Sequence, residues 1–155
     1  MEKGYYVGRV EGNLYRITDG TYQCAFMTTS DGVVLFDAPA TIGHNIQRAV
    51  DEIAMANGVS NKVTHLIYSH HHADHAGASS LFDRNITRIG HEETRKLLLR
   101  DDDHARPAPE ETFQDRSPSR SRASASSWPG TAQITRRTTS LSICRGMLRS
   151  CSSTS

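Results

Sequence analysis

The chain reads SHHHADHA from Ser69 to Ala76, and the rest of the sequence is interpreted outward from this stretch. Four histidines and one aspartate fall within six residues, directly after the apolar run Val63–Tyr68. Alternate side chains of an extended backbone project to the same side, so His70 and His72 can bind one cation together. Neutral imidazole and carboxylate are ligands that suit Zn²⁺ or non-haem iron. The stretch therefore predicts a metal site.

The end of the stretch offers a second pair of ligands. Asp74 and His75 lie at the turn toward the next helix, where they can reach a second cation near the first. Bound cations of this kind lower the pKa of a water and stabilise an oxyanion. His71 projects the opposite way in an extended chain and is left outside the ligand set. The alternatives are a histidine-rich surface loop without a specific metal and a purification tag, although a tag sits at a terminus and this cluster is in mid-chain.

Short β-rich runs separated by turn residues precede the histidine stretch. Strands are expected at residues 5–10, 14–17, 23–29 and 33–36. Ser30-Asp31-Gly32 is typical of a hairpin turn, and Val33–Phe36 is apolar throughout, as in a strand buried on both faces. Helical spacing of apolar residues from Ile42 to Ile53 predicts a helix, with Thr41 as its cap and Gly58 as its end.

Strands and helices alternate in the remainder of the patterned region. The expected elements are a strand at 63–68, a helix at 76–82, a strand at 87–89, a helix at 91–100 and a loop at 101–111. This alternation predicts α/β layers. Outside the SHHHADHA stretch, His44, His91 and His104 are expected to be solvated, and Cys24 is expected to be a buried hydrophobic residue and not a nucleophile.

Two motifs together resemble a known family. His70-x-His72-x-Asp74-His75 after a strand resembles the HxHxDH signature of the metallo-β-lactamase superfamily, and Gly32–Asp37 resembles that family's earlier strand ending in aspartate. The resemblance covers about residues 5–116, which correspond to the N-terminal half of such a domain. It implies a four-layer αββα sandwich, incomplete in this chain.

The resemblance also implies roles for individual residues. His70 and His72 would bind the first metal, and Asp74 and His75 the second. Asp74 would in addition orient or deprotonate the attacking water, and Asp37 would hold the motif loop in place. Two Zn²⁺ ions are expected in a complete site, with iron or manganese as other options.

The implied function is a metal-dependent hydrolase, in which metal-activated water attacks an ester, thioester, lactone, amide or phosphoester. The substrate is expected to be a small molecule, and a β-lactam is not favoured because no export signal is visible. No apolar run is long enough for a membrane helix, so a cytoplasmic location is expected. The alternatives are a truncated product without activity and a di-iron redox relative.

The C-terminal residues have a different composition from the rest. Residues 1–116 hold 12 Lys and Arg against 17 Asp and Glu, a net charge of −5, whereas residues 117–155 hold six Arg, no acid and 12 Ser. We therefore divide the chain into a metallo-β-lactamase-like part, 1–116, and a Ser/Arg-rich tail, 117–155, which is predicted to be frameshifted or disordered. A genuine basic tail that binds nucleic acid or a partner is the rival explanation, and nucleic acid is not favoured.

The tail itself suggests a reading-frame shift near Arg116. Codons for Ser127–Ile143 can be chosen so that reading from the third base gives LAWHGPNHSPDNIFIY. That string resembles the family's next motif, a histidine followed by Ser-Pro-Asp-Asn. The chain as written has no histidine after His104, so each metal lacks the further histidine that the resemblance implies. A half-sandwich would leave apolar surface uncovered, so self-association is expected.

Overall fold

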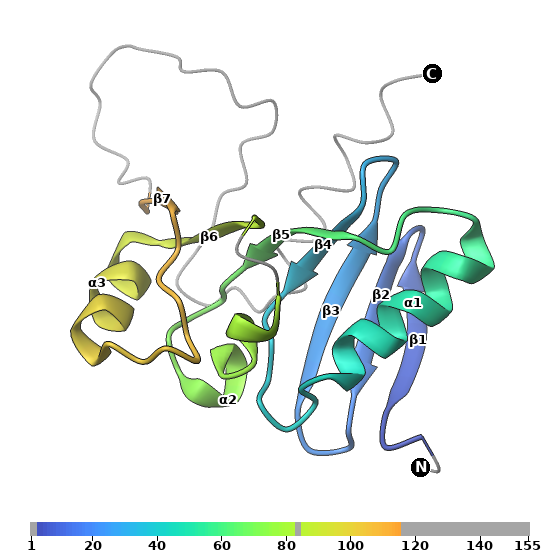
Figure 1. Cartoon of the computed structure of the whole chain (residues 1–155), viewed down its shortest axis with the longest axis horizontal. Coiled ribbons are helices and arrows are strands. Elements are labelled where there is room, and N and C mark those ends of the chain that lie inside the picture. The colour runs from blue at the N-terminus through green and yellow to red at the C-terminus, as the bar shows by residue number, and fades with distance from the viewer. Residues whose placement is uncertain (1–2, 83–84, 116–155) are drawn as a thin grey trace. The chain divides into compact units, whose positions relative to one another are not determined.

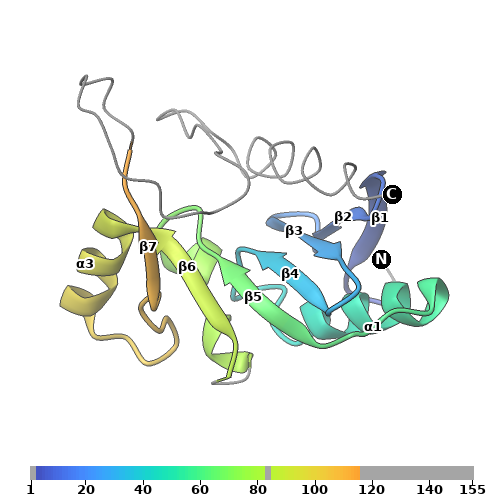
Figure 2. The ribbon, with the colours of Figure 1, turned by 90° about the horizontal axis from the view of Figure 1, so that it is seen from above.

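The computed structural model describes residues 3–82 and 85–115. Within this part of the chain, seven strands form one sheet in the order of the sequence, as Figure 2 shows from β1 to β7. The strands are β1 (Tyr6–Glu11), β2 (Leu14–Thr18), β3 (Gln23–Thr28), β4 (Val33–Phe36), β5 (Val63–Ile67), β6 (Thr87–His91) and β7 (Glu111–Phe113). The predicted α/β class is confirmed.

The sheet has an antiparallel part and a parallel part. Strands β1 to β4 pair antiparallel through short turns, and β4 to β7 pair parallel. Parallel neighbours require crossover connections, which here contain helices. These are α1 (Asn45–Asn57), α2 (Ala73–Ala76) with the 3₁₀ turn η1 (Ser79–Leu81), and α3 (Glu92–Asp101). Because β4, β5 and β6 run the same way, the segments that follow them begin at one edge of the sheet.

The turn between β3 and β4 shows why glycine is required there. Gly32 has φ 140°, and its carbonyl accepts a hydrogen bond from the Thr29 amide at 2.8 Å. A Cβ at this position would lie 2.5 Å from the carbonyl oxygen of Lys62, the residue directly before β5. The predicted hairpin is therefore confirmed, and its glycine also lets β5 approach β4.

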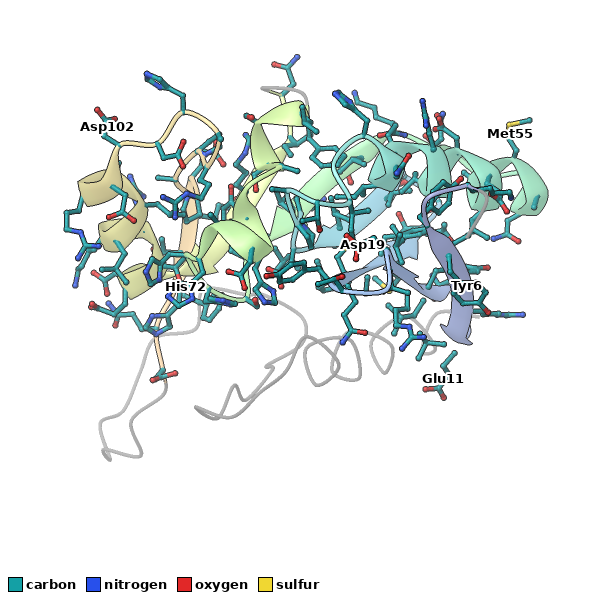
Figure 3. All side chains as sticks on the ribbon, turned by 90° about the horizontal axis from the view of Figure 1, so that it is seen from below. Tyr6, Glu11, Asp19, Met55, His72 and Asp102 are labelled. Carbon is teal, nitrogen blue, oxygen red and sulfur yellow. The ribbon has the colours of Figure 1, made fainter. Side chains whose placement is uncertain are left out.

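The hydrophobic core lies between α1 and the sheet. One side of α1 buries Ile46, Ala49 and Val50, which belong to the same cluster as Leu35 and Phe26 of the sheet. The helix crosses the sheet in Figure 1, and Met55 on its outer side is 81 % exposed (Figure 3). Full burial of an isoleucine or valine side chain, as at Ile46 and Val50, contributes about 1.5–3 kcal/mol. All four residues of β4 are buried, which confirms the prediction for that strand.

Two local expectations were wrong, and a third was wrong only at its ends. Helix α1 begins at Asn45 and not after Thr41, because hydrogen-bonded turns occupy the residues from Pro39 to the helix start. The Thr41 side chain does not cap the helix; its hydrogen bond to Asp19 lowers the pKa of that carboxyl. Helix α2 begins at Ala73 and ends at Ala76, the residue at which a helix was expected to start. The expected loop 101–111 is confirmed for residues 102–110, whereas Asp101 ends α3 and Glu111 begins the short strand β7, which pairs with β6 through backbone groups. Gly58 does end α1, in the left-handed conformation.

None of the helices in the described part of the chain has the length and hydropathy that a bilayer span needs. The predicted tail 117–155, with its suspected frame shift near Arg116, lies outside the described residues.

Candidate metal centre

The candidate site lies where β4 and β5 end. Asp37 directly follows β4, and the Ser69–His75 stretch begins two residues after β5. The amide of Asp37 donates to the Ile67 carbonyl at 3.0 Å, and the amide of Ala38 donates to the His75 carbonyl at 2.7 Å. Backbone hydrogen bonds therefore bring the two strand ends together before any side chain is considered.

The carboxylate of Asp37 is the buried centre of this arrangement. The residue is 2 % exposed, and its φ of 61° is in the left-handed region that aspartate tolerates better than most residues. It accepts hydrogen bonds from the Ser69 amide at 2.7 Å, from the Ser69 hydroxyl at 2.6 Å and from His75 Nδ1 at 3.3 Å. These donors compensate the cost of burying a charge.

The hydroxyl of Ser69 links Asp37 to His70. Ser69 Oγ lies 2.6 Å from Asp37 Oδ2 and 2.8 Å from His70 Nδ1. A hydroxyl has one proton, and Asp37 accepts it, so the neutral His70 ring donates its Nδ1 proton to Ser69. The lone pair of His70 is then on Nε2. The order aspartate–serine–histidine also differs from that of a nucleophilic triad, in which the carboxylate contacts the histidine.

His75 is oriented in the same way. Its Nδ1 donates to Asp37, which leaves Nε2 as the nitrogen with a lone pair when the ring is neutral. The hydrogen bond to Asp37 raises the pKa of His75 above its ordinary value. Burial, together with the neighbouring His75, lowers the pKa of His70. One buried carboxylate therefore fixes the tautomers of two histidines, directly and through a serine.

Three side chains offer ligand atoms close to one another. His70, Asp74 and His75 each provide one atom, and these atoms all lie within 4.8 Å of one another. His75 Nε2 is 3.7 Å from Asp74 Oδ2, and the rings of His70 and His75 are 4.3 Å apart. Two imidazoles with free Nε2 atoms and a carboxylate are a donor set that fits Zn²⁺ or iron.

The remaining histidines of the stretch lie at its outer side. His72 is exposed at the N-terminus of α2 (Figure 3), and its ring is 4.9 Å from that of His70. It is outside the group of three, and its role as a ligand stays a prediction. The ring of His71 packs 4.4 Å from that of His72, and burial lowers its pKa.

Sequence reasoning missed two residues of this region. The sequence pattern assigns no role to Ser69, although a hydroxyl next to a predicted ligand and to a buried strand end is a usable signal. Tyr22 lies edge-on to His75 with ring centroids 6.5 Å apart. It comes from the β2–β3 turn, and no local pattern connects that turn with the histidine stretch. Cys24 is buried as expected, and burial raises the pKa of its thiol.

Comparison with known proteins gives the family of the chain. The family model of the metallo-beta-lactamase superfamily matches residues 17–130. The structure is similar to a metallo-beta-lactamase from Pontibacter korlensis, with a TM-score of 0.54 and 18 % identity over 70 % of this chain and 52 % of that chain.

Two further solved structures show the same similarity. Metallo-beta-lactamase IND-7 has a TM-score of 0.54 and 23 % identity over 75 % of this chain and 55 % of that chain. The metallo-beta-lactamase FIM-1 from Pseudomonas aeruginosa, solved in a mono-zinc form, has a TM-score of 0.51 and 9 % identity over 70 % of this chain and 50 % of that chain. No curated protein matches the sequence. The chain spans about half the length of these structures, and by its family match it belongs to the metallo-β-lactamase superfamily.

Proposed function

We propose that this chain carries the first half-site of a metal-dependent hydrolase. The observation that carries the proposal is that His70, Asp74 and His75 offer ligand atoms within 4.8 Å of one another. The supporting observation is that Asp37 and Ser69 hold both imidazoles with Nε2 free. A surface loop of solvated histidines would have no need of such a buried anchor.

Each residue has a definite part in this proposal. His70, His72, Asp74 and His75 hold the metal, and Zn²⁺ is the expected ion, with two in a complete site and iron or manganese as other options. The bound metal supplies Lewis-acid chemistry, which acidifies a water and stabilises an oxyanion. Asp74, whose side chain is 42 % exposed, is the carboxylate that can orient the water or accept its proton. Asp37 keeps the ligand loop in place.

The proposed substrate is a small molecule with an ester, thioester, lactone, amide or phosphoester group. The test is zinc binding by the full chain together with turnover of a generic aryl ester. We expect Asp74→Asn to reduce turnover far more than it reduces zinc binding, because the amide can still contact a cation but cannot accept the proton. Turnover that does not depend on metal or on Asp74 would contradict the assignment.

A second candidate is that the chain as written is a non-catalytic product. It is supported by the change of composition after residue 116, since residues 117–155 hold six Arg and 12 Ser but no Asp, Glu or His. We propose that the reading frame shifts near Arg116 and that the other frame encodes the next metal-ligand motif. Sequencing the coding DNA across this junction tests the proposal. Recovery of a HSPDN-like string after one insertion or deletion is expected, and its failure would end the frame-shift explanation.

A cytoplasmic location and self-association through uncovered apolar surface stay predictions. Size-exclusion chromatography with light scattering tests the second, since a monodisperse monomer would contradict it.

A further inference from the structure

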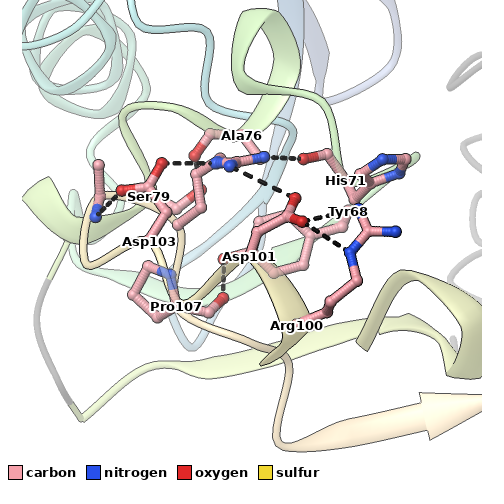
Figure 4. Close-up of polar contacts among 10 residues, drawn as sticks. Tyr68, His71, Ala76, Ser79, Arg100, Asp101, Asp103 and Pro107 are labelled. Atoms are coloured by element: carbon pink, nitrogen blue, oxygen red, sulfur yellow. Dashed lines mark hydrogen bonds and ion pairs between the residues drawn. The ribbon is translucent and has the colours of Figure 1, made fainter. Parts of the chain in front are cut away.

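A mostly buried arginine side chain connects the ligand stretch to the segment after α3. Arg106 Nη1 donates to the carbonyl oxygen of His71 at 2.6 Å, and its Nε donates to Asp103 Oδ2 at 2.7 Å. The Arg106 side chain is 12 % exposed, and its Nη2 lies 3.6 Å from Asp101 Oδ2. The three residues that accept from or face the guanidinium, His71, Asp101 and Asp103, are labelled in Figure 4.

The acceptors of Arg106 are themselves fixed. Asp103 Oδ1 accepts from the Ala105 amide at 2.9 Å, and the Asp103 carbonyl accepts from the Arg106 amide at 2.9 Å. Arg100 donates twice to Asp101 Oδ1, at 3.0 and 2.7 Å. A guanidinium is planar and presents its donors in a rigid fork, so these partners determine its orientation.

The segment that carries Arg106 is also attached at two other points. The Tyr68 hydroxyl donates to the Pro107 carbonyl at 2.7 Å, and the Ser80 amide donates to the Ala105 carbonyl at 3.2 Å. Tyr68 precedes the ligand stretch, and Ser80 follows it. Arg106 therefore projects from a support that brackets the ligand stretch on both sides.

The carbonyl that Arg106 holds is placed between two of the proposed ligands. His71 lies between His70 and His72, and its carbonyl belongs to the peptide that joins it to His72. A hydrogen bond to that carbonyl fixes the peptide plane and thereby limits how the two flanking rings can turn. The loss of such support lowers metal affinity in other sites by roughly 10–100-fold.

We propose that Arg106 is a positioning residue, which sets the metal affinity of the ligand stretch by holding the His71 carbonyl. The inference rests on the proposed metal site and adds to it a residue more than thirty positions away in the sequence. Asp103 is the partner that aims the guanidinium, and Asp101 adds negative charge beside it.

The test is a Co²⁺ titration of the full chain, followed by the visible absorption of the bound ion. Arg106→Met should weaken Co²⁺ binding about tenfold and change the cobalt spectrum, because the ligand rings lose their fixed orientation. Arg106→Lys should recover part of the affinity, since an ammonium can still donate to the carbonyl. Arg95→Gln is the matched control, because the exposed Arg95 of α3 donates to the Glu110 carbonyl at 3.3 Å and this bond involves neither the ligand stretch nor the acceptors of Arg106. A change within about twofold is expected for such a surface position.

The thermal unfolding of each metal-free variant is measured in parallel. Lower stability with wild-type Co²⁺ affinity and spectrum in Arg106→Met would overturn the inference, as would an equal loss of affinity in Arg95→Gln. If Arg106→Met does not fold, Asp103→Asn decides: an affinity loss of about threefold supports the inference, and no loss overturns it. If the wild-type chain binds no Co²⁺, the proposed metal site itself is wrong. If the wild type and Arg106→Met bind Co²⁺ equally well, only the role of Arg106 is wrong.

Discussion

Strands β5 and β6 are parallel neighbours, and the histidines at the ends of the two strands make different hydrogen bonds: His70 follows β5, and His91 is the last residue of β6. After β5, the Nδ1 atom of His70 donates to the Ser69 hydroxyl, which leaves Nε2 as the lone-pair nitrogen. At the end of β6, the Nδ1 atom of His91 accepts a hydrogen bond from the Glu93 amide at 3.1 Å and caps α3. A neutral His91 therefore carries its proton on Nε2.

If the proposed metal site is right, residue type alone does not make a histidine a metal ligand. The hydrogen bond at Nδ1 decides which nitrogen is left for a cation, and the partner of that bond comes from the surrounding fold. At β5 the partner is a serine hydroxyl that Asp37 orients from the end of β4, whereas at β6 it is a helix amide. The predictions below test this contrast.

The largest effect is expected when the buried anchor of the β5 end is removed. Asp37→Ala leaves the donors on Ser69 and His75 without their acceptor, and we expect a loss of about 3 kcal/mol or more in the free energy of unfolding. Asp37→Asn keeps one acceptor oxygen and tolerates the left-handed backbone, so it should lose less. Urea denaturation of both metal-free variants measures the difference. Equal stability of Asp37→Ala and the wild type would show that the anchor is not needed.

The next largest effect is expected on zinc affinity when a histidine is removed near the end of β5, compared with removal of the histidine at the end of β6. His75→Ala should weaken Zn²⁺ binding roughly 100-fold, which corresponds to about 2.7 kcal/mol, since it removes one of the three neighbouring side chains proposed as ligands. Isothermal titration calorimetry with zinc measures this loss. His91→Ala is the matched control from the neighbouring strand, and zinc affinity should be unchanged in it. A similar loss in both variants would mean that the two strand ends do not differ in the way described.

Ser69→Ala tests the bridge between Asp37 and His70. Without the hydroxyl, the His70 ring is free to rotate and to change tautomer, so zinc affinity should fall about tenfold. The exposed Ser80→Ala variant, measured by the same calorimetry, removes the same atom at a position away from Asp37 and should bind zinc as the wild type does. Wild-type affinity in Ser69→Ala would contradict the proposed role of the hydroxyl.

At the β6 end, the expected effect is on stability alone. His91→Ala removes the side chain that caps α3 and should reduce the free energy of unfolding by about 1 kcal/mol. Thermal or urea unfolding of the metal-free protein measures this. Unchanged stability would show that the contact with Glu93 does not contribute.

The smallest effect is a pH dependence of the metal-free protein. The hydrogen bond to Asp37 raises the pKa of His75. The protonated form of His75 therefore stabilises the fold below the ordinary histidine pKa of 6.5, and this stabilisation is lost as the pH rises through the raised pKa. The pKa of His70 is lowered by burial, so its contribution is present above 6.5 and is lost as the pH falls. Titration of the ring protons by NMR should give His75 above His70, and Asp37→Asn should lower the His75 value. The reverse order would contradict the hydrogen bonds described.

Much of the fold follows from local patterns in the sequence. The apolar run Val33–Phe36 predicts a doubly buried strand because both of its faces are hydrophobic, and the spacing from Ile42 to Ile53 predicts α1 because it matches one helix face. Strand β7 could not be predicted in this way. Its three residues have no periodic pattern, and they form a strand because β6 offers backbone partners.

In the candidate site too, residues close together in the sequence could be predicted, whereas contacts between distant segments could not. His70, Asp74 and His75 are close in sequence, so a short stretch of chain suffices to predict that they lie together. Asp37 could be included because the strand before it resembles a family motif. The histidine His91 was expected to be solvated, which was wrong because the start of α3 uses its ring as a cap. Arg106 depends on a contact between distant segments, which no local pattern reports.

X-ray absorption at the zinc edge of the zinc-loaded full chain tests the central claim most directly, since it identifies the ligands of the bound ion. The account predicts at least two imidazoles and a carboxylate oxygen at about 2.0–2.2 Å, with the imidazole signal reduced in His75→Ala and unchanged in His91→Ala. A coordination shell of oxygen atoms alone, or an imidazole signal that survives the loss of both His70 and His75, would contradict it.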